Sequence, residues 1–150
     1  MIHTNSITNA LYTILSSDQI IVNSAVNVEL YTVENGNQNR TPWIGVVPGE
    51  MGLDVEYEPA RVNIHEPWMA QVSIPLILQS ASRSKQAGLQ KLDGLQSIVM
   101  SAVNCYESGQ RTLMSTVDII IGFSVSPLER GELEGLFFMR RLDIIAQALT

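Results

Sequence analysis

The chain has 150 residues, a length typical of one domain, and we expect residues 1–150 to form a single unit with its own core. Fifteen acidic residues against nine basic ones give a net charge of −6, which argues against binding to a nucleic-acid backbone or an anionic membrane. The single cysteine, Cys105, excludes an internal disulfide, and no apolar run is long enough to span a bilayer. Charged residues make up only 16% of the chain, so neighbouring subunits are expected to cover part of its surface.

The N-terminal third is predicted to hold a helix and two strands. Residues 4–17 carry apolar side chains at helical spacing, whereas residues 18–25 suit either a strand or a short helical turn. Residues 26–33 alternate between apolar and polar side chains, as in a half-buried strand, and residues 43–47 form the next strand. The polar segment 34–42 contains Asn-Gly and Pro turn signals, so we expect an exposed loop between two hairpin strands. The first fifteen residues lack the basic and long apolar regions of a signal peptide, which favours synthesis in the cytoplasm.

The middle of the chain is predicted to hold an acidic loop and a long strand. Residues 49–60 look irregular, and their carboxylates lack the spacing of a calcium loop. A short strand is expected over 61–65 and a long one over 68–81. Pro75 has no N–H to donate, which predicts that the long strand lies at a sheet edge or contains a bulge at this position.

The second half begins with the clearest helical pattern, over residues 84–106, and ends in a long hairpin. Residues 116–126 and 136–147 are its two strands, with 127–135 as the turn region. The first strand alternates strictly, with its odd-numbered residues from Val117 to Val125 predicted on one face. Four apolar residues fall on the opposite side of the hairpin: Ile120, Phe137, Met139 and Ile145. One helix layer covers one face only, so we expect a second cover, either a neighbouring subunit or the N-terminal helix.

These elements predict an α+β fold: a mainly antiparallel sheet with a long helix packed on one face, a short N-terminal helix and a C-terminal β-hairpin. No cofactor or metal motif is recognisable, so we expect neither. An enzymatic reading depends on His65, Glu66 and Cys105, and nothing in the sequence brings these together, so we expect no catalytic activity. A ligand-binding module is the other alternative, with aromatic lining from Trp43, Tyr57 and Trp68.

Arg140 and Arg141 are adjacent in a predicted strand, so their side chains are expected to point to opposite faces. One of them is then directed at the helix layer or at a subunit boundary, where it needs an acidic partner such as Asp143 or a carboxylate of a neighbour. An ordinary exposed pair on an edge strand is the alternative.

The order of segments resembles a known family. An amphipathic N-terminal helix leads into VNVELYTVENGNQNRTPWIGVVPGE, then the strand PWMAQVSIPLILQSAS and the helix SKQAGLQKLDGLQSIVMSAVNCY. The chain closes with the hairpin TVDIIIGFSVSPLERGELEGLFFMRRLDIIAQAL. In layout and length, over nearly the whole chain, this resembles the tail-terminator proteins of long-tailed bacteriophages, the group that includes the lambda-type minor tail protein U.

The resemblance implies a virion protein, assembled in the host cytoplasm, that forms a hexameric ring. Such a ring caps the tail tube, ends its polymerisation and joins the tail to the neck, while DNA passes through the lumen without specific binding. Its partners are then further copies of itself, the tail tube protein and a head-completion protein, and another tail-completion or neck subunit is the nearest alternative. The expected subunit contacts are Pro75, Phe137, Met139, Arg140 and Arg141, and the expected ring-face contacts are Asn37 and Arg40 in one loop and Glu50, Asp54 and Glu56 in the other.

Overall fold

The computed structural model describes residues 3–31, 41–59, 68–104, 110–126, 129–130 and 137–149. The helices are α1 (Thr4–Ser17), α2 (Gln19–Asn23), α3 (Gly49–Gly52) and α4 (Lys85–Val103), with a 3-10 turn, η2 (Gln110–Thr112). The strands are β1 (Asn27–Leu30), β2 (Trp43–Val46), β3 (Asp54–Pro59), β4 (Trp68–Ala81), β5 (Ile119–Val125), β6 (Glu129–Arg130) and β7 (Phe137–Leu149).

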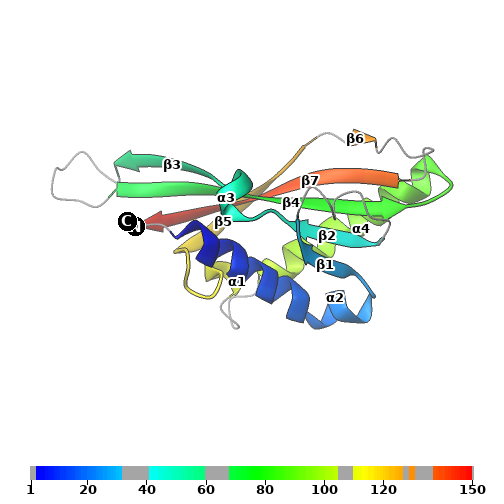
Figure 1. Ribbon diagram of the computed structural model, residues 1–150, viewed down its shortest axis with the longest axis horizontal. Helices are drawn as coiled ribbons and strands as arrows, with labels where there is room; N and C mark the ends of the chain where they lie inside the picture. Colours follow the sequence, from blue (N-terminus) through cyan, green and yellow to red (C-terminus); the bar gives the residue numbers. More distant parts are fainter. Residues whose placement is uncertain are drawn as a thin grey trace.

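The seven strands of the described residues form one sheet, with α1, α2 and α4 on one side of it (Figure 1). The strand order is β1-β2-β4-β7-β5, with β3 also beside β4 and β6 also beside β7. All pairs except β1 with β2 are antiparallel. The predicted α+β class and its mainly antiparallel sheet are therefore confirmed.

The long strands β4 and β7 form the centre of this sheet. They pair antiparallel along the whole of β7, so that Ile74 lies opposite Ile144 and Leu76 opposite Leu142. Side chains alternate between the two faces of a strand, and the even-numbered residues of both strands point toward the helices. Nearly all of these even-numbered residues are buried, and each large apolar one contributes roughly 1.5–3 kcal/mol through removal from water.

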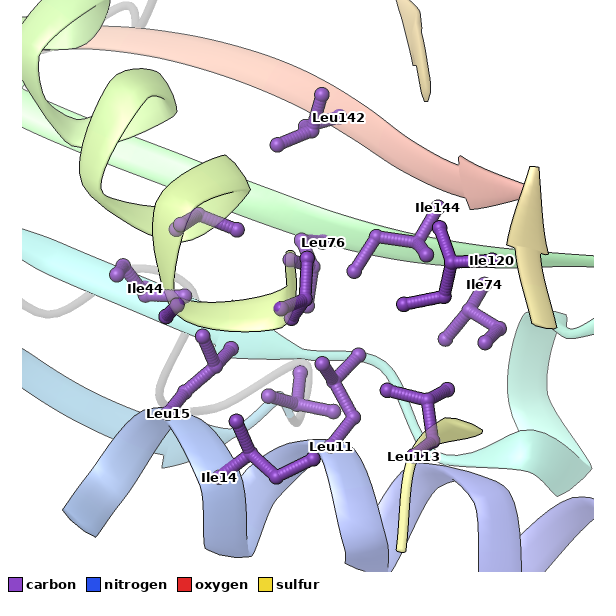
Figure 2. Close-up of a cluster of buried hydrophobic side chains, with 14 of the residues drawn as sticks. Leu11, Ile14, Leu15, Ile44, Ile74, Leu76, Leu113, Ile120, Leu142 and Ile144 are labelled. Carbon is purple, nitrogen blue, oxygen red and sulfur yellow. The ribbon is translucent and has the colours of Figure 1, made fainter. Parts of the chain in front are cut away.

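The helices cover this even-numbered face. Figure 2 shows Leu11, Ile14 and Leu15 of α1 directed toward Ile44 and Leu76 of the sheet. Helix α4 adds its predicted apolar stripe to the same core, and Ser84 caps its first turn by accepting a hydrogen bond from the Ala87 N–H. Because α1 lies on the same face as α4, the N-terminal helix does not provide the second cover that the sequence led us to expect.

The pairing of β1 with β2 corrects the expected hairpin. Asn27 aligns with Trp43 and Leu30 with Val46 in a parallel register. A parallel pair needs a crossover of about a dozen residues, and the twelve-residue segment 31–42 has that length. The ambiguous segment before β1 is helical, because Asp18 caps α2 by accepting a hydrogen bond from the Ile21 N–H.

The segment predicted to be an irregular acidic loop contains α3 and the strand β3. Val55 pairs with Val72 and packs against the core, while Asp54 and Glu56 on either side of it are exposed. Apolar and polar residues therefore alternate in β3, but the segment has too few apolar residues for the sequence to predict a strand. The short strand predicted over 61–65 lies outside the described residues.

Pro75 does not mark a sheet edge, since β4 has neighbours on both sides. Strand β3 pairs with β4 as far as Ser73, and β2 pairs with it from Leu76 onward. Pro75 lies between these two partners, where no neighbouring strand requires a backbone donor from it.

A β-bulge also corrects the predicted alternation of the last hairpin. The register of β5 against β7 shifts between Ile120 and Gly122, so Ile121 has no opposite residue. Ile120, before the bulge, pairs with Ala146 and is buried in the core, and after the bulge Phe123 takes the same face by pairing with Ile144, while Ile121 and Val125 are exposed. The antiparallel hairpin of β5 and β7 is otherwise as predicted, and part of its turn region forms β6.

Two glycines of α4 give a matched stability test. A Cβ at Gly88 would overlap the buried ring of Phe138, whereas a Cβ at Gly94 meets no atom within 4 Å. We expect Gly88→Ala to lower the free energy of unfolding by about 1–3 kcal/mol through overpacking. Gly94→Ala should raise it by about 0.5–1 kcal/mol, because alanine favours the helix. Urea unfolding of both variants measures the difference, and equal effects would contradict the Gly88–Phe138 contact.

Candidate functional site

The adjacent arginines of β7 point to opposite faces, as predicted. Arg140 points toward the helices and donates to Asp93 Oδ1 at 2.6 Å and Gln96 Oε1 at 2.9 Å, both on α4. Its side chain is 13% exposed, whereas that of Asp93 is 68% exposed. Arg141 lies on the other face, where its Nε donates to Asp143 Oδ1 at 3.0 Å. Arg140 therefore ties α4 to the sheet, and Arg141, 44% exposed, remains accessible.

The face of the sheet away from the helices is called here the open face, and it consists of the odd-numbered residues of β4 and β7. No helix among α1, α2 and α4 covers it (Figure 1). Four of the five predicted subunit contacts share this face, and they are Pro75, Phe137, Met139 and Arg141. Pro75 is buried, and Phe137 and Met139 are half-buried. Ile77 and Ile145 add further half-buried apolar area, so the open face combines apolar side chains with one ion pair.

The predicted ring-face residues are only partly described. Asp54 and Glu56 of β3 are exposed, and both share the open face because they align with Ser73 and Gln71 of β4. The side chain of Glu50 and the residues Asn37 and Arg40 lie outside the described part of the chain. The described acidic pair thus extends the open face at its β3 end.

The three aromatic residues predicted to line a ligand pocket do not share one site, because Trp43 lies at the opposite end of β4 from Tyr57 and Trp68. Trp43 aligns with Gln79 and Tyr57 with Ala70, nine positions or about 30 Å apart along β4. Trp43 is buried, its ring lies against Gly45, and it contacts the ring of Tyr31 at a centroid distance of 6.2 Å. Its role in the described structure is packing.

A groove of about 420 Å³ does exist elsewhere, between α4, the segment after α2, and the ends of β2 and β4. Its apolar lining includes Val26, Pro42, Ala81, Leu95 and Ile98. Gly94 lies in the wall and opens it, because it has no side chain there. Lys91 also lines the groove and donates from Nζ to the Ala81 carbonyl at 3.0 Å. Sequence reasoning missed this groove because its residues come from segments far apart in the chain.

The turn after η2 has an unusual backbone. Leu113, Met114 and Ser115 have φ values of 46°, 55° and 67°, so three successive non-glycine residues lie in the left-handed region. Such a conformation costs roughly 1–2 kcal/mol per residue, or about 3–6 kcal/mol for the turn. Strain of this size persists only where the surroundings determine the conformation.

The surroundings of this turn do so in two ways. Leu113 is fully buried among core residues that include Leu11, Ile74 and Ile120 (Figure 2). Two hydroxyl groups brace the backbone: Thr112 Oγ1 accepts from the Ser115 N–H, and Thr116 Oγ1 donates to the Leu113 carbonyl at 2.7 Å. Met114 stands at the apex and is 57% exposed. The turn therefore fixes the backbone that carries an exposed apolar side chain.

The described residues contain no group of three His, Cys, Asp or Glu side chains that could hold a metal ion. His65, Glu66 and Cys105, the residues of the enzymatic reading, lie outside the described part of the chain. Among the described helices, none has the length and apolar character required to cross a membrane.

Comparison with known proteins shows similarity at the level of the fold. No protein-family model matches the chain, and no curated protein matches it either. The fold is similar to that of a chain in a solved structure described as "Virion of native gene transfer agent (GTA) particle". The match covers 95% of this chain and 92% of the other, with a TM-score of 0.50 and 15% sequence identity.

The contrasting positions of the two arginines give a second stability prediction. We expect Arg140→Met to lower the free energy of unfolding by about 1–3 kcal/mol, because α4 loses its hydrogen bonds to β7. Arg141→Met, at an exposed site, should change it by less than about 0.5 kcal/mol. Asp93→Asn should cost less than about 1 kcal/mol, since water screens its exposed carboxylate. Chemical denaturation of the three variants measures their free energies of unfolding. A loss for Arg141→Met as large as that for Arg140→Met would refute the different roles assigned to the two arginines.

Proposed function

We propose that this chain is a virion structural protein, a tail terminator that forms a hexameric ring on the end of a phage-type tail tube. In this role it stops tube growth and joins the tail to a neck or head-completion protein. The observation that carries the proposal is the fold likeness to a virion chain, which spans nearly the full length of both proteins. The element order expected of a tail terminator, ending in a long antiparallel hairpin, supports the same role.

The open face supports assembly on physical grounds. Its half-buried apolar residues surround the Arg141–Asp143 pair, a combination of apolar area with arginine that is common in protein interfaces. A neighbouring subunit is proposed to cover Phe137, Met139 and Arg141, next to Pro75, which is already buried within its own chain. Arg140 belongs to the fold of each subunit, because it is engaged with α4.

The two faces of the proposed ring contact the tube protein on one side and the neck on the other. The candidate contacts are Asn37, Arg40, Glu50, Asp54 and Glu56. The net charge of −6 suits a ring whose lumen lets DNA pass, because like charge repels the phosphate backbone. Retention on duplex DNA at low salt would contradict this part of the proposal.

The groove favours a second candidate, a small-ligand binding module. Its volume of about 420 Å³ and apolar lining fall within the range of ligand sites. A thermal-shift screen of metabolites distinguishes the two functions, since only a ligand-binding module should gain stability from a member of the screen.

The ring itself is the main test of the proposed function. Light scattering on the purified chain, alone and with tail tubes, should reveal an assembly of six subunits. Negative-stain electron microscopy should show rings, either free or at one end of each tube. A chain that stays monomeric and leaves tube ends unoccupied would overturn the proposal.

A charge reversal tests the open face in assembly. We expect Arg141→Glu to reduce ring formation, because it places a second carboxylate beside that of Asp143 on the proposed contact. Arg83→Glu, at an exposed site in the loop before α4, makes the same change in net charge and should leave assembly intact. Sedimentation velocity measures both, and unchanged assembly of Arg141→Glu would remove the open face from the interface.

A further inference from the structure

The exposed large apolar residues of the described chain fall into two groups. Ile20, Val22 and Leu30 lie on α2 and β1, whereas Met114, Ile121 and Val125 lie on the left-handed turn and on β5. Strands β1 and β5 are the first and last in the strand order, so the two groups lie at opposite edges of the sheet. Figure 1 shows α2 and the turn before β5 at opposite ends of the helix layer.

The group at the β1 edge adjoins the groove. Ser24 and Val26, which follow α2 directly, form one wall, and Leu95, Ile98 and Gly94 of α4 form the facing wall. The exposed Ile20 and Val22 therefore lie only a few residues before the wall of a concave site, which is the shape that receives a protruding side chain.

The group at the β5 edge includes such a side chain. Met114 is held at the apex of the braced left-handed turn, with buried Leu113 anchoring it to the core. Because the backbone is fixed before any contact is made, burial of Met114 costs only the freedom of its side-chain rotamers. A methionine side chain also adapts its shape to an irregular apolar site.

We propose that Met114 of one copy inserts into the groove between α4 and the segment after α2 of the next copy. This inference rests on the proposed ring and adds a head-to-tail contact to the cover already proposed for the open face. The two surfaces are different and lie at opposite ends of the same chain, so the contact is heterologous: each copy gives Met114 to one neighbour and receives it from the other. Contacts of this kind form closed rings when the rotation between copies closes.

Two variants break the contact from either side. Met114→Asp replaces the inserted side chain by a charge, and Gly94→Trp fills the groove from its open wall. Each should weaken self-association by about tenfold to a hundredfold, the factor for losing one buried methionine side chain. The matched controls are Met114→Leu and Gly94→Ala, which keep the apolar insert and the open groove and should assemble like the parent chain.

A mixture of the two defective variants tests the head-to-tail geometry. The Met114→Asp variant keeps an intact groove, and the Gly94→Trp variant keeps an intact Met114. One contact can therefore still form, in which Met114 of the second variant enters the groove of the first. We expect the mixture to form dimers that contain one copy of each variant and grow no further. Sedimentation velocity detects these dimers, and circular dichroism of each variant confirms that it is folded.

Disulfide cross-linking supplies a second measurement in a Cys105→Ser background. Copies carrying both Met114→Cys and Gly94→Cys should oxidise to covalent chains and rings, while Thr13→Cys with Gly94→Cys, from an exposed site on α1, should not. If the parent chain forms rings but the defective variants also form them and no cross-link appears, this contact is wrong and the proposed function stands. If the parent chain is monomeric with and without tubes, both are overturned.

Discussion

The pairing of β4 with β7 is the constraint on which the rest of this structure depends. Two strands of thirteen and fourteen residues run side by side, and their common register fixes which residues face the helices. A shift of one position would exchange Ile74, Leu76, Leu142 and Ile144 for the more polar odd-numbered set. The core, the open face and the separation of Arg140 from Arg141 are all consequences of this register.

Much of this arrangement could be predicted from the sequence where one periodicity runs unbroken over many residues. The helix over 4–17, the strand over 68–81 and the helix beginning after Ser84 agree with the structure, because each has enough apolar residues at one spacing. The opposite orientation of Arg140 and Arg141 follows from strand geometry alone.

The remainder depends on tertiary contacts that local patterns do not encode. The parallel pairing of β1 with β2 is not encoded in the pattern of either strand, and β3 has Val55 as its one described apolar contact with the core. The bulge at Ile121 exchanges the faces on which the odd- and even-numbered residues of β5 lie. The sequence does not reveal this, because the apolar run Ile119–Ile121 fits either face. Pro75 indicates an edge or a bulge on sequence grounds alone, because a sequence does not reveal that two short strands divide one side of β4 between them.

Helix α4 is attached to β7 at two successive even-numbered positions. The ring of Phe138 lies against Gly88 near the start of the helix, and the guanidinium of Arg140 binds Asp93 and Gln96 near its middle. The helix wall of the groove therefore cannot tilt or slide without disturbing the central strand. A displacement of that wall would also displace Phe138 and Arg140, which lie on a strand paired along its whole length with β4, so the shape of the groove is coupled to the register at the centre of the sheet.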